Sequence, residues 1–314
     1  AAGRSPEMSA ARGKRTLSRR AFLGGAAAVS AGGLEFLSLA GRFDHRALTM
    51  RKQSIRAPDA LRALAAHGLN AAVLHVGHST HLVQIGGLRV LTDPWFYDPS
   101  HGGMRHAAGP AFLPEELDEL AAIVVTHEHP DHEDPRALDR LDKRAHVFVA
   151  TPEQRVRMRR LGFAQVTVLA PWESARVGAL NLHAVPAVHD VYEIGYVLHA
   201  GTDSVYFAGD TALHPAIDQL RERFAPTAAI LPVDGTGYRA GQQWVLGPEQ
   251  AAAVAARLGV GCVMPTHHEA HLTDPVLALL LEQADDSLVR FGKRLRTVTP
   301  TTRMITPGPG EVVS

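Results

Sequence analysis

Short apolar runs dominate the chain from residue 72 onward, and their lengths separate strands from helices. Runs of this kind without a 3.6-residue repeat predict β-strands. Gly86-Gly87, between the second and third runs, is typical of a tight hairpin turn. The predicted strands cover residues 72–76, 80–85, 88–91, 121–125, 147–150, 166–169, 180–185, 195–199, 204–208, 228–231 and 261–265.

Helical patterns lie before, between and after these runs, and several of them begin with proline. Proline is accepted in a first helical turn because the N–H that it lacks has no helical partner there. The predicted helices cover residues 58–64, 114–120, 135–141, 152–161, 215–223, 248–258 and 275–288. Strands cluster first and then alternate with helices, which favours an α/β fold: an αββα sandwich of two packed mixed β-sheets with helices outside.

The N-terminal 40 residues carry a basic stretch followed by a modest apolar run. The run is shorter than the ~20 residues that a membrane-spanning helix needs, so we expect no stable span beyond it. Residues 18–23, SRRAFL, resemble a twin-arginine (Tat) export signal, and residues 38–40 offer a cleavage site. We therefore predict a signal peptide over residues 1–40, the twin-arginine export machinery as a partner, and a periplasmic or otherwise exported protein. An uncleaved N-terminal anchor is the alternative.

Composition narrows the possible chemistry. The 32 basic and 32 acidic residues balance, whereas a surface that binds nucleic-acid phosphates usually carries a basic excess, so no nucleic-acid partner is expected. The single cysteine excludes a disulfide within the chain. The 18 histidines make a metal site more probable, because histidine is the commonest metal ligand.

Four metal-competent side chains follow the buried strand predicted at residues 121–125. His127 and His129 alternate on an extended segment, which places both side chains on one side. A proline then interrupts the segment, so Asp131 and His132 can face a second point. With further candidates downstream, the ligands exceed what one tetrahedral ion needs. Imidazole and carboxylate suit zinc, and also manganese or iron.

The segment HEHPDH at residues 127–132 resembles the HxHxDH signature of the metallo-β-lactamase superfamily. Three further segments resemble later motifs of that family in the same order, and each follows a predicted strand. The resemblance implies that His127, His129 and His189 hold one divalent ion. It also implies that Asp131, His132 and His267 hold a second ion and that Asp210 bridges the two. His268 stands where relatives usually place an aromatic residue, and His267 is the better-aligned ligand.

The upstream segments at residues 76–87 and 90–96 narrow the resemblance to two groups. They resemble the L-ascorbate-6-phosphate lactonase-like and N-acyl-phosphatidylethanolamine phospholipase D-like branch. The resemblance implies a single domain over residues 71–314, after a lead-in at 41–70. It implies a hydrolase that uses water activated by two metal ions, most simply zinc, to cleave an ester, lactone or phosphodiester bond of a small-molecule or lipid substrate.

Further residues have expected roles beside the ligand set. Asp131, which is also a ligand, Asp93 and His78 are the candidate catalytic residues, and Asp93 is expected to order the ligand loop near the metals. His78 either lines the site or is a packing residue, and His78 or His268 is a candidate proton donor to the leaving group. Glu128 or Asp134 is expected to accept the second N–H of a ligand histidine. A di-iron redox protein and a catalytically silent binding protein on the same fold are the alternatives.

Overall fold

The computed structural model describes residues 57–68, 70–100, 103–239 and 241–314. The chain divides into two units, Ala1–Leu48 and Thr49–Ser314, and all described residues belong to the second. The signal peptide and the cleavage site that the sequence predicts lie outside the described residues. Within the described ranges, no helix combines the length and the hydrophobicity that crossing a membrane requires.

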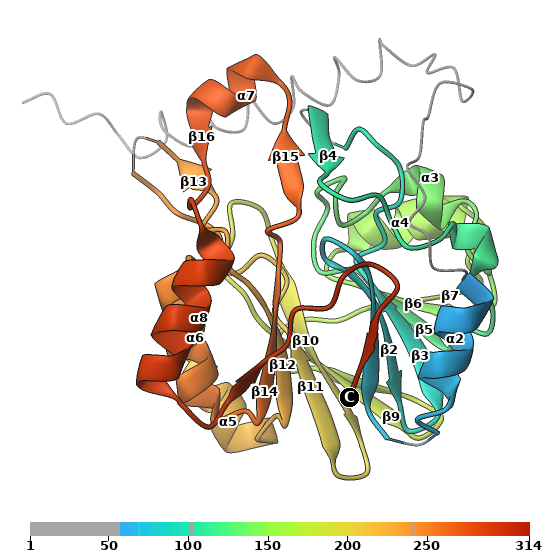
Figure 1. Ribbon diagram of the computed structural model, residues 1–314. Coiled ribbons are helices and arrows are strands. Elements are labelled where there is room, and N and C mark those ends of the chain that lie inside the picture. The colour runs from blue at the N-terminus through green and yellow to red at the C-terminus, as the bar shows by residue number, and fades with distance from the viewer. Residues whose placement is uncertain (1–56, 69, 101–102, 240) are drawn as a thin grey trace, which may run out of the picture. The chain divides into compact units, whose positions relative to one another are not determined.

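Two seven-stranded mixed sheets face each other in the second unit (Figure 1). The first sheet has the order β18-β1-β2-β3-β5-β6-β7 and the second β17-β14-β12-β11-β10-β9-β8. The strands of the first sheet are β1 (Ala72–Gly77), β2 (Thr80–Ile85), β3 (Leu88–Thr92), β5 (Ala122–Val124), β6 (His146–Val149), β7 (Gln165–Val168) and β18 (Val312–Val313). Those of the second are β8 (Ser174–Val177), β9 (Leu180–Pro186), β10 (Ile194–Ala200), β11 (Asp203–Phe207), β12 (Ala228–Pro232), β14 (Cys262–Thr266) and β17 (Arg303–Met304).

Apolar side chains from both sheets fill the space between them. Val83 and Val90 of the first sheet pack in one cluster with Leu182, Leu198 and Phe207 of the second, and all five are buried. Strands such as β5 are buried on every residue, which explains why their sequences lack the apolar–polar alternation of half-exposed strands. This cluster joins the two sheets into one core.

Helices cover the outer faces, so the predicted α/β class and αββα sandwich are confirmed (Figure 1). α5 (Ala216–Phe224), α6 (Pro248–Leu258) and α8 (Ser287–Val298) pack on the second sheet through a separate apolar cluster. On the first sheet lie α2 (Ala57–Ala65) and α4 (Pro152–Arg160), with the short α3 (Pro135–Leu138) nearby.

Three predicted helices are wrong in part. The helix predicted over residues 135–141 ends at Leu138. In the segment 114–120 only the 3-10 turn η2 (Pro114–Glu116) forms, and Glu119 adopts a left-handed φ of 55° that a helix cannot contain. In the segment 275–288, α7 (Pro275–Leu280) stops because β16 (Leu281–Glu282) pairs with β13 (Gly237–Tyr238). The chain then starts a new helix, α8.

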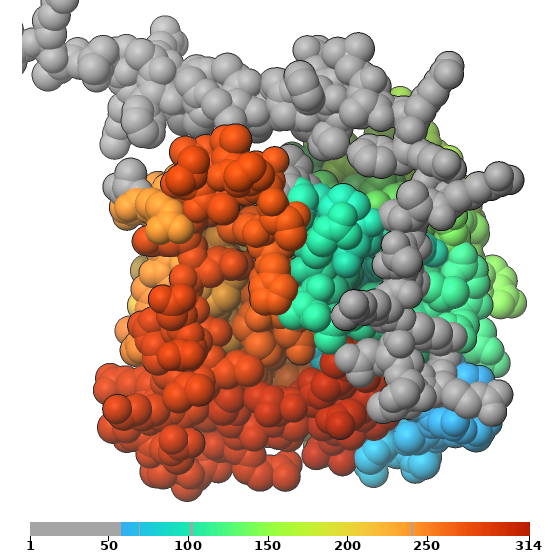
Figure 2. Space-filling view, turned by 45° about the horizontal axis from the view of Figure 1, so that its top comes forward, coloured from blue at the N-terminus to red at the C-terminus, as the bar shows by residue number. Residues whose placement is uncertain are grey.

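Two excursions lie beyond the sheet edge. β4 (Met104–His106) pairs with β15 (Ala270–Leu272), so segments far apart in sequence lie side by side. Figure 2 shows them in contact, in teal and orange, on the face turned to the viewer. α7 and β16 continue from β15 and stand above the second sheet in Figure 1.

The strand directions decide where polar residues gather. β1, β3 and β5 run in one direction in the first sheet, and β9, β11, β12 and β14 run in one direction in the second. Residues that follow these strands therefore emerge at a common edge of each sheet. The residues in question are His78, Asp93, His127, His189, Asp210, Asp234 and His267.

Candidate metal centre

One group of imidazoles joins the first ligand loop to the second sheet. His127, His129 and His189 each offer a ring nitrogen, and these atoms lie within 4.8 Å of one another. His189 Nε2 is 3.2 Å from His129 Nδ1. His127 follows β5 and His189 follows β9, so each sheet contributes to the group. These are the three residues that the resemblance assigned to one ion.

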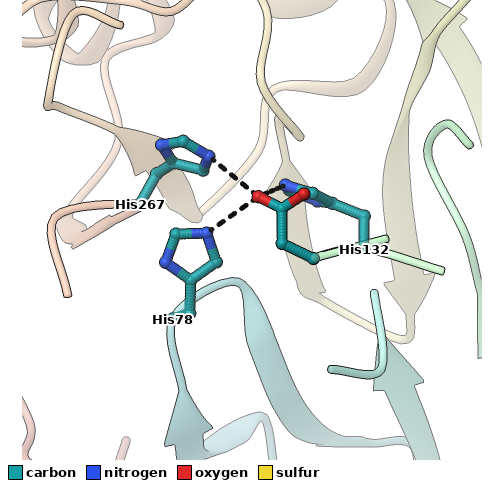
Figure 3. Close-up of side chains that lie close together, drawn as sticks. His78, His132 and His267 are labelled. Atoms are coloured by element: carbon teal, nitrogen blue, oxygen red, sulfur yellow. Dashed lines mark ion pairs between the residues drawn. The ribbon is translucent and has the colours of Figure 1, made fainter. Parts of the chain in front are cut away.

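A second group lies next to the first and mixes imidazoles with a carboxylate. His78, Asp131, His132 and His267 present ligand atoms within 4.8 Å of one another. Figure 3 shows the three labelled imidazoles converging on one carboxylate, Asp131, whose Oδ2 is 3.6 Å from His78 Nε2 and from His132 Nε2. The predicted ligands Asp131, His132 and His267 are thus brought together, and His78 joins them.

Asp210 lies against two imidazoles of the second group. Its Oδ2 is 3.1 Å from His132 Nε2 and 2.9 Å from His267 Nε2. Burial lowers the pKa of His127 and of His189, and the charge of Asp210 opposes that shift at both imidazoles. Asp210 therefore pairs directly with the second group and acts on the first group through its charge.

The unsatisfied atoms of the cluster fit a bound cation. Nε2 of His127 and Oδ1 of Asp210 are buried and have no hydrogen-bond partner. Nε2 of His132 and of His267 are also buried and form no hydrogen bond of good geometry, although each lies close to the Asp210 carboxylate. Buried polar atoms are nearly always paired, so this concentration calls for a ligand of the protein. Imidazole nitrogen and carboxylate oxygen are the donors that zinc, manganese and iron accept. The seven predicted ligands and His78 therefore fit divalent metal ions.

Neighbouring polar groups turn the ring nitrogens toward the centre. Asp93 Oδ2 is 2.7 Å from His132 Nδ1, and Asp234 Oδ2 is 3.0 Å from His267 Nδ1. Carboxylates in this position fix the ring and leave Nε2 free for a metal. His127 Nδ1 lies 2.9 Å from the Thr126 hydroxyl, which leaves the Nε2 of His127 free in the same way.

The expectation that Glu128 or Asp134 supports a ligand histidine is wrong. Glu128 points outward and pairs with Arg157 at 3.3 Å, and Asp134 caps α3 while accepting from Arg136. These contacts with Arg157 and with the start of α3 hold both carboxylates away from the imidazoles. Asp234 was missed, although it follows a predicted strand just as the predicted ligands do.

Asp93 is a positioning residue. Besides His132, its carboxylate accepts from the Thr126 N–H and from the Thr126 hydroxyl, both at 2.8 Å. Thr126 directly precedes His127, so Asp93 holds the residue at which the ligand loop starts. Glu193, which the sequence interpretation missed, accepts from the Asp210 N–H at 2.6 Å. Gly209 has φ +66° and packs directly on Glu193, where a Cβ would overlap the carboxylate.

Charge is balanced inside the cluster by the imidazoles that face Asp210. Burial on its own lowers the pKa of His132 and of His267, but Asp210 beside both, helped by Asp131 at His132 and by Asp234 at His267, raises each pKa well above 6.5. For Asp210 itself, burial acts to raise the pKa, but His132 and His267 hold it well below its ordinary value. In the metal-free protein, the imidazoles of His132 and His267 therefore carry the positive charge that balances the carboxylate of Asp210.

The comparisons with known proteins agree with this geometry. Residues 88–268 match the family model of the β-lactamase superfamily domain. The chain belongs to this superfamily. The predicted superfamily is thereby confirmed, and so is the coarse prediction of a metal-dependent hydrolase, because similar proteins carry that name.

Three proteins show how similar this chain is to known members of the superfamily. A metal-dependent hydrolase of Pyrobaculum aerophilum is 28% identical over 199 residues, 61% of this chain and 81% of that protein. A possible metal-dependent hydrolase from Veillonella parvula has a TM-score of 0.65 at 18% identity, covering 78% of this chain and 99% of the other. An isothiocyanate hydrolase from Delia radicum gut bacteria has a TM-score of 0.63 at 19% identity, covering 77% and 98%. The two structures support the fold.

Proposed function

We propose that this protein hydrolyses an ester, lactone or phosphodiester bond with two divalent metal ions held side by side, zinc being the expected metal. The observation that carries the proposal is the pair of ligand groups, the second of which faces Asp210 through His132 and His267. Two ions at such a site lower the pKa of a water molecule from about 15.7 to about 7 and polarise the bond under attack. Manganese and iron are the alternatives that the same donor atoms accept.

Carboxylates hold the ligand rings in place, and one side of the site is exposed to solvent. Asp93 and Asp234 hold the rings of His132 and His267, so the donor atoms need little reorganisation. The side chains of His129 and Asp190 are each 30% exposed, whereas that of His132 is fully buried. A substrate therefore reaches the centre from the His129 side.

Exposed apolar side chains indicate which class of substrate the site accepts. Nine large hydrophobic side chains are exposed among the described residues, and seven of them lie in the loops and short elements, α8 excluded, that follow β9, β11, β12 and β14. These seven, which we call the apolar rim, are Val188, Tyr192, Leu213, Tyr238, Val276, Leu279 and Leu280. Exposed apolar groups gathered beside a site favour a partner or substrate with an apolar part. The rim supports an acyl-chain or lipid substrate over a small polar one.

Several contacts link segments of the rim to one another and to the metal side. The Ala212 N–H donates to the Val188 carbonyl at 2.7 Å, which joins two of its loops. The Trp244 ring lies 6.4 Å from His189 and 4.2 Å from Tyr238, and so links the metal side to β13. β13 in turn pairs with β16, which directly follows α7.

Leu279→Asp is expected to reduce kcat/KM for long-chain ester substrates by about tenfold and to leave short-chain substrates unchanged. The reason is that Leu279 is 76% exposed, so the folded state tolerates the change, while an acyl chain loses roughly 1.5 kcal/mol of apolar contact. Val289→Asp on α8, at a residue that is 69% exposed and outside the rim, is the matched control. Equal losses on short and long chains in the Leu279 variant would refute the role of the rim.

We propose in addition that the protein is exported by the twin-arginine machinery through residues 18–23. The double substitution Arg19→Lys with Arg20→Lys is expected to keep the protein in the cytoplasm of a bacterial host that has this pathway. Arg15→Lys, in the same basic stretch, is the control that leaves export intact. Cell fractionation with immunoblotting measures the outcome, and normal periplasmic accumulation of the double variant would contradict the signal.

A further inference from the structure

We propose that His78 is an additional protein ligand of the second metal position, beside Asp131, His132 and His267. The inference rests on the proposed metal centre and adds one imidazole to its seven expected ligands. It makes this position richer in protein donors than the one formed by His127, His129 and His189.

The ring of His78 points at the centre of the second group. It is fully buried, and its Nε2 lies 3.6 Å from Asp131 Oδ2. The centroid of the ring is 4.4 Å from that of His267 and 5.8 Å from that of His132. Figure 3 shows His78 rising from the β1–β2 turn to face the same carboxylate as His132 and His267. All four donor atoms therefore lie around one point.

Neither ring nitrogen of His78 has a hydrogen-bond partner, and both are buried. A histidine that serves only to fill the core would keep at least one such partner, because an unpaired buried polar atom costs about 1–3 kcal/mol. The ring also contacts Trp95 edge to face, with centroids 5.1 Å apart, and an indole ring offers packing and no acceptor. Coordination of an ion by one ring nitrogen would give that nitrogen the partner it lacks.

The backbone of His78 is held in an unfavourable conformation that aims the ring. Its φ is +52°, in the left-handed region, which costs a residue with a Cβ roughly 1–2 kcal/mol. Two contacts maintain it: the Thr266 hydroxyl donates to the His78 carbonyl at 2.7 Å, and the His78 N–H donates to Glu269 Oε2 at 3.1 Å. Thr266 and Glu269 flank His267, so the segment that carries one ligand also positions the other.

Glu269 is itself fixed by a buried imidazole. Its Oε2 is 2.6 Å from His75 Nε2, and His75 Nδ1 is 3.0 Å from His81 Nδ1. His75 and His81 belong to β1 and β2, the strands joined by the turn that bears His78. These contacts connect the first sheet to the end of β14, and they hold His78 close to His267.

Cobalt titration of the full-length protein tests the proposal. The metal-free protein, its His78→Gln variant and a His106→Gln control are titrated with Co²⁺, and the visible absorption is followed. We expect His78→Gln to reduce the affinity for the second cobalt ion by about 10- to 100-fold. The visible absorption band of that ion alone should change. His106 is also buried, pairs with Asp98 and lies outside every ligand group, so its variant retains both ions.

His78→Cys keeps the test decisive if the glutamine variant does not fold. A thiolate that contacts Co²⁺ produces an intense near-ultraviolet charge-transfer band, which we expect from His78→Cys on addition of the second equivalent. Absence of that band in a folded His78→Cys variant that binds two ions would overturn the proposal and leave the proposed function intact. Binding of no second ion by the unaltered protein would instead defeat the two-metal function on which the proposal rests.

Discussion

Asp210→Asn is expected to lose hydrolytic activity by roughly a thousandfold, equivalent to about 4 kcal/mol of transition-state stabilisation. The substitution preserves side-chain shape but removes the charge that faces His132 Nε2 at 3.1 Å and His267 Nε2 at 2.9 Å. The amide also offers N–H donors where a cation needs an acceptor. Bound metal should fall from the two proposed ions to one or fewer, because the proposed bridging carboxylate is lost.

Steady-state kinetics and metal analysis of the purified variant measure this result. Asp203→Asn is the matched control, because Asp203 lies at the opposite end of the same strand, β11, and only accepts from the Ala71 N–H. We expect it to keep its metal and its turnover. Turnover of Asp210→Asn at the rate of the unaltered protein would sink the two-metal assignment.

The affinity for divalent metal is expected to rise steeply with pH. In the metal-free protein His132 and His267 carry protons at neutral pH, because Asp210 and its neighbours outweigh burial and raise each pKa well above 6.5. A metal must displace those protons, so affinity rises about tenfold per pH unit for each proton released. With both protons displaced, the gain approaches a hundredfold per unit between pH 6.5 and the raised pKa values.

The same shifts give the opposite sign for the stability of the metal-free protein. A group whose folded-state pKa is raised contributes stability that is fully present below 6.5 and lost as the pH rises through the folded-state value. Alkaline conditions should therefore weaken the metal-free fold while they strengthen metal binding.

Isothermal titration in buffers of different ionisation enthalpy counts the protons released. Asp234→Asn removes one carboxylate that raises the pKa of His267, so it should release fewer protons than the unaltered protein. An affinity that does not change between pH 6.5 and 8.5 would exclude this account. The same preparations identify the metal, and iron with oxygen-dependent turnover would favour the di-iron redox alternative.

Sequence pattern predicted the strands well because burial and turn chemistry act locally. The second predicted strand, residues 80–85, and the helix at 248–258 have the bounds that the structure gives to β2 and α6. The edge strand β8 (Ser174–Val177) was missed because none of its residues is buried and its sequence carries little apolar signal. The helix predicted over 275–288 was interrupted by pairing with β13, some 40 residues away, which a local pattern cannot reveal.

The sequence predicted the ligand residues of the metal cluster, but it did not predict the residues that hold those ligands in place. His127, His129, Asp131 and His132 are adjacent in sequence, so their pattern carries information by itself. Glu193 and Asp234 act on ligands that are distant along the chain, and their roles follow only from the packing of loops at one sheet edge. His78 remained ambiguous because a lone histidine after a strand is consistent with packing and with ligation alike.

Because the ligands are divided between two sheets, metal binding depends on how the two sheets pack against each other. His127 to His132 emerge from one sheet, and His189, Asp210 and His267 emerge from the other, so neither sheet alone possesses an intact cage for a cation. Coordination tolerates displacements of only a few tenths of an ångström. A core substitution that lets the layers slide slightly would thus release the ions while the secondary structure persists, and metal retention would be a more sensitive gauge of native packing than circular dichroism.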